Sequence, residues 1–205
     1  MASASRDEIF AALRAAAPAH PRAGLPIARA LYAAPALSAS VETFAANLDA
    51  AGGRLVRCEA SALGDALARL EGFAQATHVW SSRPEIAARG VACDVPTPHA
   101  LATLDFAVLR GELAVAENGA VWHAPSSPLE RAAALLAEHL VLVVPEGSLV
   151  ATLHEAYARI DACASAFGWF LAGPSKTADI EQALVLGAHG PCAATVVLTR
   201  EPLHP

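Results

Sequence analysis

Residues 54–80, RLVRCEASALGDALARLEGFAQATHVW, decide the fold class of this chain. Within them, residues 54–58 predict a short strand, residues 61–70 a helix and residues 77–80 a second strand. A strand, a helix and a strand in this order are typical of a βαβ unit, in which the two strands lie parallel and the crossover is right-handed. The stretch therefore predicts an α/β protein with a mainly parallel sheet and helices on both faces.

The same alternation continues on either side of this stretch. Upstream, Ser38 or Ser40 can cap a helix that runs to about Ala51 and stops at Gly52-Gly53. Downstream, we predict a helix opening at 82–85, helices at 127–138 and over most of 147–166, and strands at 139–144, 167–172 and 193–199.

In the middle of the chain, three short apolar runs follow one another at 104–109, 112–116 and 120–123. The last two are separated by Glu117-Asn118-Gly119, which we call the ENG turn. Asn-Gly between two apolar runs predicts a tight hairpin, because both residues tolerate a positive φ. Glu117 either belongs to this hairpin and nothing more, or projects into a ligand cleft.

The N-terminal part is organised differently. Residues 3–17 predict a helix, and residues 18–35 hold four prolines and Gly24, which cannot continue it. We therefore divide the chain into an N-terminal helix with a proline-rich connector, residues 1–35, and one larger domain, residues 36–205.

Composition sets outer limits. The chain has 205 residues, enough for one well-packed core, and it is 55% hydrophobic but only 5% aromatic. No stretch reaches the roughly 18 uninterrupted apolar residues that a membrane span needs. The N-terminus MASASRDEIF carries early charges and lacks the apolar core of a secretory signal. We expect a cytoplasmic protein without a membrane span.

Charge and cysteines exclude further classes. The net charge is −6 and the 14 basic residues are scattered singly, which argues against nucleic-acid binding. Iron–sulfur and structural zinc sites usually have closely spaced ligands, whereas the four cysteines are isolated and form no C-x-x-C pair. We expect buried free thiols, no metal site and no cofactor in this chain.

The most unusual stretch is Gly173–Pro191, GPSKTADIEQALVLGAHGP, which we call the signature segment. Glycine at 173 removes the Cβ that would keep a ligand from the backbone, Ser175 and Thr177 offer hydroxyls, and Lys176 adds a positive charge.

The signature segment has two interpretations. One is a pocket for a small anion at the carboxyl end of the strand 167–172, where open α/β sheets bind ligands. The other is a capped turn, in which Thr177 caps a short helix that carries Asp179 and Glu181 in its first turn. The two can hold together.

Candidate site residues come from the signature segment and the ENG turn. His189 can act as a general acid or base near neutral pH. The catalytic candidates are Glu117, Lys176, Asp179 and His189. Ligand contacts are predicted for Asn118, Gly119, Gly173, Ser175, Lys176, Thr177, Asp179, Glu181, His189 and Gly190, and we expect one cleft to unite the two motifs.

Other enzyme signatures are missing from the sequence. It contains no G-x-G-x-x-G, no P-loop and no G-x-S-x-G elbow. The remaining histidines have no metal-binding spacing and receive little weight: His20, His78, His99, His123, His139 and His154.

With the upstream LAVAENGAVW, the signature segment resembles the lactate-utilisation protein C family, whose members consist of a LUD domain. The resemblance covers roughly residues 40–200 and is most specific in the last third. It implies a fold similar to glucosamine-phosphate deaminase, ribose-phosphate isomerase and the CoA transferases. It also implies a non-redox, ligand-binding component of L-lactate oxidation to pyruvate, acting with partner proteins that carry iron–sulfur clusters.

Some alternatives stay open. Many members of the family have a threonine where this chain has Asn118, so the turn should survive while an identical role is not implied. The wider fold superfamily also permits an independent enzyme acting on a sugar phosphate or an acyl (CoA-type) substrate. The sequence leaves homo-oligomerisation open.

Overall fold

The computed structural model describes residues 2–16, 38–82, 98–161, 167–177 and 185–200. Contacts divide the chain into two units, Met1–Ala33 and Ala34–Pro205. In the first unit, α1 spans Ala2–Ala16, which confirms the helix predicted at 3–17. The connector predicted at 18–35, and with it the boundary after residue 35, lies outside the described residues and stays a prediction.

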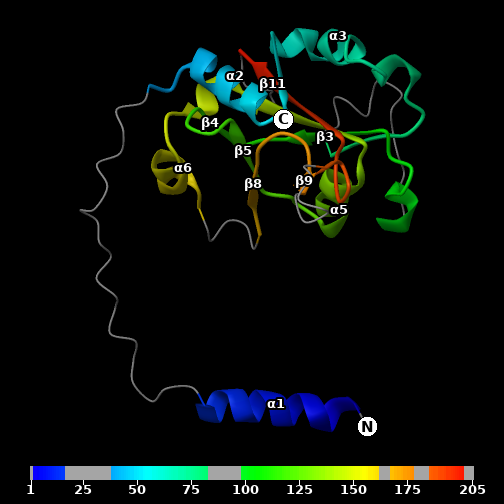
Figure 1. Ribbon diagram of the computed structural model, residues 1–205, viewed down its shortest axis with the longest axis vertical. Coiled ribbons are helices and arrows are strands. Elements are labelled where there is room, and N and C mark those ends of the chain that lie inside the picture. Colours follow the sequence, from blue (N-terminus) through cyan, green and yellow to red (C-terminus); the bar gives the residue numbers. More distant parts are fainter. Residues whose placement is uncertain (1, 17–37, 83–97, 162–166, 178–184, 201–205) are drawn as a thin grey trace. The chain divides into compact units, whose positions relative to one another are not determined.

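The second unit is built on a five-stranded sheet in the order β1-β11-β6-β3-β2, and every pair of neighbours is parallel (Figure 1). The predicted strands are confirmed with shifts of one or two residues at their ends. Their bounds are β1 Arg54–Cys58, β2 Val79–Ser81, β3 Phe106–Arg110, β6 His139–Pro145 and β11 Ala193–Thr199.

Helices cover both faces of this central sheet, as predicted. Along β6, Leu140 and Leu142 face a core shared with α2 (Val41–Ala50) and α5 (Pro128–Leu136). Val141 and Val143 point to the opposite face and pack with α3 (Leu63–Ala68). Figure 1 shows α3 and α5 on opposite sides of the central strands. The alternation follows from the two-residue period of a strand, and both halves are apolar because both faces are covered.

Side-chain caps fix where the helices begin. Ser40 accepts a hydrogen bond from the backbone of Thr43 at the start of α2, and Ser127 does the same for Glu130 at the start of α5. At the other end of α2, Gly52 has a φ of +80°, which confirms the predicted stop. The helix predicted to open at 82–85 lies outside the described residues beyond Ser82.

A second sheet of four strands, in the order β7-β4-β5-β8, packs beside the first. Its centre is the antiparallel hairpin of β4 (Leu113–Val115) and β5 (Ala120–His123), which confirms the turn predicted at Asn-Gly. The other strands are β7 (Leu149–Val150), parallel to β4, and β8 (Trp169–Leu171), antiparallel to β5.

The prediction of a helix over most of 147–166 is wrong in its first part. Residues 149 and 150 form β7 because their backbones pair with Ala114 and Val115 of β4. The helix, α6, spans only Leu153–Arg159, and Thr152 caps it by accepting from the backbone of Glu155. Tertiary pairing outweighs local helix preference here. None of the described helices has the length and apolar character that a membrane crossing requires.

Candidate functional site

The ENG turn is held against α2. Gly119 has a φ of +67°, and a side chain there would collide with the backbone of Asn47 and Leu48. The Asn47 amide donates hydrogen bonds to the carbonyl oxygens of Ala116 (2.7 Å) and Glu117 (3.2 Å). Glycine is therefore needed at 119 for a close approach of two backbones.

The side chains of the ENG turn have structural partners. The half-buried Glu117 carboxylate accepts a hydrogen bond from the backbone N–H of Leu153 (2.8 Å), the first residue of α6. The Asn118 side chain accepts from the backbone N–H of Ala120 (3.1 Å) inside the turn. Both residues thus stabilise the hairpin and its neighbour. The catalytic role predicted for Glu117 and the ligand contact predicted for Asn118 stay predictions.

The described part of the signature segment forms a small ladder. Residues Lys176–Thr177 are β9 and pair antiparallel with β10, Val185–Leu186. Ser175 closes the ladder, because its N–H donates to Pro191 (2.9 Å) and its carbonyl accepts from Gly187 (3.0 Å). Lys176 and His189 are exposed.

Residues 176 and 177 are therefore paired strand rather than the predicted turn. Asp179 and Glu181 lie outside the described residues, and so does the helix that Thr177 was predicted to cap. The described residues give no test of that cap.

The start of the signature segment packs on the end of α2. A Cβ at Gly173 (φ +69°) would collide with the carbonyl of Ala51, three residues beyond Leu48, against which Gly119 packs. Three helical residues rise about 4.5 Å. The antiparallel pairing of Val121 with Leu171 also places both turns at the same end of the second sheet. The structure thus brings the ENG turn and the start of the signature segment together.

A cavity of about 470 Å³, the amino-end cavity, lies where the strands of the central sheet begin. The signature segment borders it through Pro174, and Cys192, the residue after that segment, also lines it. Arg54, Asp105 and His139 are among its polar lining residues. Cys192 is exposed there, so the expectation of buried thiols is wrong for this residue, because it lies at the cavity edge just before β11 begins.

The signature segment follows β8, which belongs to the second sheet. For that reason it meets the amino ends of the central strands, whereas the sequence predicted the carboxyl end of a strand in the parallel sheet.

Polar groups of the amino-end cavity are held by local hydrogen bonds. Asp105 accepts from the backbone N–H groups of His78 and Thr77 (2.8 Å each), and these bonds lower the pKa of its carboxyl. His139 stacks on Phe106 and its Nε2 lies 2.8 Å from the Thr195 hydroxyl. Burial lowers the pKa of His139, so its imidazole is neutral at pH 7.

A larger cavity of about 920 Å³, the carboxyl-end cavity, begins at the carboxyl end of β3. It is lined by Arg110 at the end of β3, by Glu112 between β3 and β4, by Ser126 and by Arg159 of α6. Among the described residues, neither guanidinium forms an ion pair with a carboxylate. Glu112 is half-buried and accepts from the backbone of Ala124 (3.2 Å); burial raises the pKa of its carboxyl.

A buried carboxylate, that of Glu130, holds Ser126 in place at this cavity. Glu130 is only 4% exposed and accepts hydrogen bonds from Ser82 Oγ (2.7 Å), Ser126 N (2.7 Å) and Ser126 Oγ (2.6 Å). Burial alone would raise the pKa of Glu130, but these hydrogen bonds outweigh it and lower the pKa. The carboxylate thereby ties the end of β2 to the start of α5.

His123 contacts the backbone of Arg110 from the protein interior. It is 1% exposed, and its Nδ1 lies 2.7 Å from the carbonyl oxygen of Arg110, so Nδ1 carries the proton. Burial lowers the pKa of His123 and keeps the ring neutral. Its Nε2 and the Nε1 of Trp169 have no hydrogen-bond partner in the part of the chain that the structure describes.

Sequence reasoning missed this second set of residues and gave His123 little weight. Two signals could have revealed it. An Arg-Gly-Glu run, residues 110–112, ends a fully buried strand, and Ser126-Ser127-Pro128-Leu129-Glu130 combines a helix cap with a carboxylate three residues further on. Within the described ranges, no group of three or more histidine, cysteine or acidic side chains could hold a metal ion.

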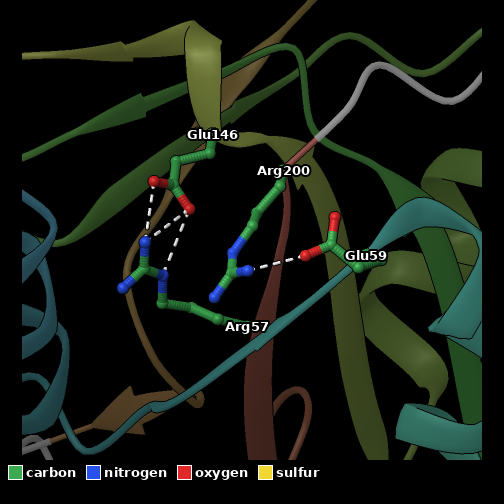
Figure 2. A network of polar contacts seen from close by, with 4 residues as sticks. All are labelled: Arg57, Glu59, Glu146 and Arg200. Carbon is green, nitrogen blue, oxygen red and sulfur yellow. Dashed lines mark hydrogen bonds and ion pairs between the residues drawn. The ribbon is translucent and has the colours of Figure 1, made fainter.

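Two ion pairs lie at the carboxyl edge of the central sheet (Figure 2). Arg57 of β1 makes a bidentate contact with Glu146, with nitrogen–oxygen distances of 2.8 to 3.1 Å. Arg200, just after β11, contacts Glu59 at 2.7 Å. These pairs join the ends of β1, β6 and β11 at the surface.

The carboxyl-end cavity and both motif turns lie within one stretch of sequence that has known relatives. The LUD domain family model matches residues 97–199. Lactate utilization protein C of Shouchella clausii is 30% identical over 103 residues, 46% of this chain and 43% of that protein. The protein of the same name from Bacillus licheniformis is 31% identical over 104 residues, 47% of this chain and 43% of that protein.

The matched region therefore spans less than half the length of these curated relatives. A solved structure shares the fold: the crystal structure of a DUF162 family protein from Deinococcus radiodurans has a TM-score of 0.58 and 19% sequence identity. The likeness covers 77% of this chain and 94% of that one.

Proposed function

Since this chain belongs to the LUD domain family, we propose that it acts in lactate utilisation, as a non-redox component that binds a small organic carboxylate. The relatives named lactate utilization protein C support the metabolic role, and they match the region that holds the ENG turn and the signature segment.

One observation carries the binding role: two arginines, Arg110 and Arg159, line the carboxyl-end cavity, and neither is paired with a carboxylate among the described residues. A guanidinium offers paired N–H donors that match a carboxylate. Glu112 lies in the same cavity and can hydrogen-bond the hydroxyl of a 2-hydroxy acid. The position agrees with the general rule that open α/β sheets bind ligands at the carboxyl ends of their strands.

Electron transfer in this proposal belongs to partner proteins with iron–sulfur clusters. This part rests on the resemblance to the lactate-utilisation protein C family. Co-purification of the chain from lactate-grown cells, with the bound proteins identified, tests it: recovery of iron–sulfur proteins is expected, and their absence from the complex would contradict it.

Growth tests the metabolic role. A strain that lacks this chain, retains the partner proteins and has no second copy should grow poorly on L-lactate and normally on glucose. Normal growth on lactate would overturn the role. Turnover of a phosphorylated sugar by the purified chain alone would support instead the independent enzyme that the fold superfamily permits.

Calorimetric titration with L-lactate tests the binding site. Arg110→Ala should weaken binding about tenfold or more, because a charge-assisted contact is lost. Arg69→Ala removes the same charge from an exposed position outside the cavity and should leave binding unchanged. Lys176→Ala tests the signature segment as the second candidate position. If Lys176→Ala weakens L-lactate binding and Arg110→Ala does not, the binding site lies at the signature segment and not in the carboxyl-end cavity.

A further inference from the structure

The carboxyl-end cavity is much larger than lactate. Its volume of about 920 Å³ lies near the upper end of the range for cavities that hold drug-sized ligands, about 300–1,000 Å³. A three-carbon acid held by the arginines would leave most of this volume to water. The charge of the cavity fits a 2-hydroxy acid, whereas its size fits one with a larger side group.

The remaining lining shows what kind of side group fits. Three aromatic residues border the cavity and come from three segments: Trp122 of β5, Tyr157 of α6 and Phe167 before β8. The rings of Trp122 and Tyr157 both pack on Phe170, at centroid distances of 4.9 and 5.5 Å. The Trp122 ring also lies directly over Gly168, where any side chain would collide with it. Packing on Phe170 thus holds two of the three lining rings in place.

Two of these rings remain open to solvent. Tyr157 is 64% exposed and Phe167 is 40% exposed, although both carry large apolar surfaces. Exposed apolar residues that gather at one cavity mark a binding surface, because a ligand removes their area from water. Aromatic rings bind other rings in stacked or edge-to-face arrangements, which adds geometric selectivity.

We propose that the carboxyl-end cavity binds 2-hydroxy carboxylates that carry an aromatic ring, with the carboxylate at Arg110 and Arg159 and the ring among Trp122, Tyr157 and Phe167. The inference rests on the proposed function, because it keeps the 2-hydroxy acid and names a larger member of that class. In this arrangement the Glu112 carboxyl forms the hydrogen bond to the 2-hydroxyl of the ligand. Its side chain shares the cavity with Arg110, and its half-buried carboxyl can accept or donate a hydrogen bond.

Titration of the full-length chain with L-phenyllactate and L-lactate tests this inference. L-phenyllactate should bind about tenfold tighter or more, since burial of a phenyl ring adds apolar area. Tyr157→Ala should remove most of that gain and leave L-lactate binding unchanged; Tyr157 is exposed, so the fold tolerates the change. Arg110→Ala should weaken both ligands, and Arg69→Ala neither. Phenylpropanoate lacks the 2-hydroxyl and should bind more weakly than phenyllactate.

The outcomes separate this inference from the proposed function. Equal affinity for the two acids, or equal weakening of both by Tyr157→Ala, would overturn the ring-bearing class; Arg110-dependent lactate binding would then still support the proposed function. The converse result combines two measurements. If phenyllactate binds tightly through Arg110 and Tyr157 but a strain without this chain grows normally on lactate, the binding site is supported and the role in lactate utilisation is overturned.

Discussion

The two ends of the central sheet carry cavities of opposite character. The amino-end cavity is bordered by the signature segment and has one arginine, Arg54, among three carboxylates, those of Glu71, Asp105 and Glu138. The carboxyl-end cavity has two arginines and two carboxylates, and one of these, Glu112, has a raised pKa. Carboxylates outnumber the arginine at the first cavity and balance the arginines at the second, so an anion is repelled more strongly at the first.

This difference teaches that the most distinctive sequence motif and the most suitable anion site need not coincide. In the described residues, Gly119 and Gly173 serve close backbone packing on α2 and its C-terminal cap. The charges that suit a carboxylate come from ordinary positions at a strand end and a helix end. Four predictions test this contrast.

The largest effect is expected at the carboxyl end. Glu130→Ala removes three hydrogen bonds to a buried carboxylate, so the free energy of unfolding should fall by about 3 kcal/mol. Urea denaturation measures the loss. Glu138→Ala, an exposed carboxylate at the amino end, is the control and should cost no more than about 0.5 kcal/mol. Equal losses would remove the contrast.

The contribution of Asp105, at the amino-end cavity, to the free energy of unfolding should depend on pH. Hydrogen bonds from His78 and Thr77 lower the pKa of its carboxyl below the ordinary value of 3.8. Its contribution is present above that value and is lost as the pH falls through the lower, folded-state pKa. Asp105→Asn should therefore cost about 1 kcal/mol at pH 7, because solvent screens this carboxylate, and less near pH 2. A cost that is independent of pH would show that shape, and not charge, matters at this position.

The ion pairs at the two ends should differ in strength. Arg57 and Glu146 form a bidentate contact with side chains that are 39% and 26% exposed (Figure 2). Arg54 and Glu71, at the amino end, are 3.8 Å apart and 74% and 87% exposed. Double-mutant cycles should give coupling energies of about 0.5–1 kcal/mol for the first pair and about zero for the second. Equal couplings would contradict the difference in geometry.

The smallest effect is expected at Glu112, with a sign opposite to that of Asp105. Burial raises the pKa of Glu112 above its ordinary value of 4.5, so its ionisation disfavours the folded state as the pH rises through the raised pKa. Glu112→Gln should stabilise the protein at pH 7 by about 0.5 kcal/mol or less, and the gain should vanish below pH 4. Thermal unfolding at both pH values measures it; destabilisation at pH 7 would refute the proposed desolvation.

Much of the fold could be predicted from local pattern. The strand at 139–144 is a continuous apolar run, and Ser40 and Ser127 mark helix starts by a mechanism that acts within four residues. The Asn-Gly turn is equally local. Such features depend on neighbouring residues only, and a single sequence displays them.

The division into two sheets could not be predicted, because it depends on partners distant in sequence. Leu149 and Val150 form a strand only because β4 lies beside them, and β8 joins the second sheet through pairing with β5. The same holds for the carboxyl-end cavity, which unites Arg110 with Arg159 of another element. The predicted ligand-binding roles of Ser175, Lys176 and His189 remain predictions.

The position of β11 has a consequence for how the protein is made. This strand is the last of the described strands along the chain, yet it lies between β1 and β6, with Val196 paired to Leu55 on one side and Leu142 on the other. During synthesis, β1 and β6 have no partner at those edges until residue 199 has left the ribosome. Open, apolar strand edges are templates for wrong pairing between chains. Until β11 is inserted, these two strand edges are therefore open to wrong pairing.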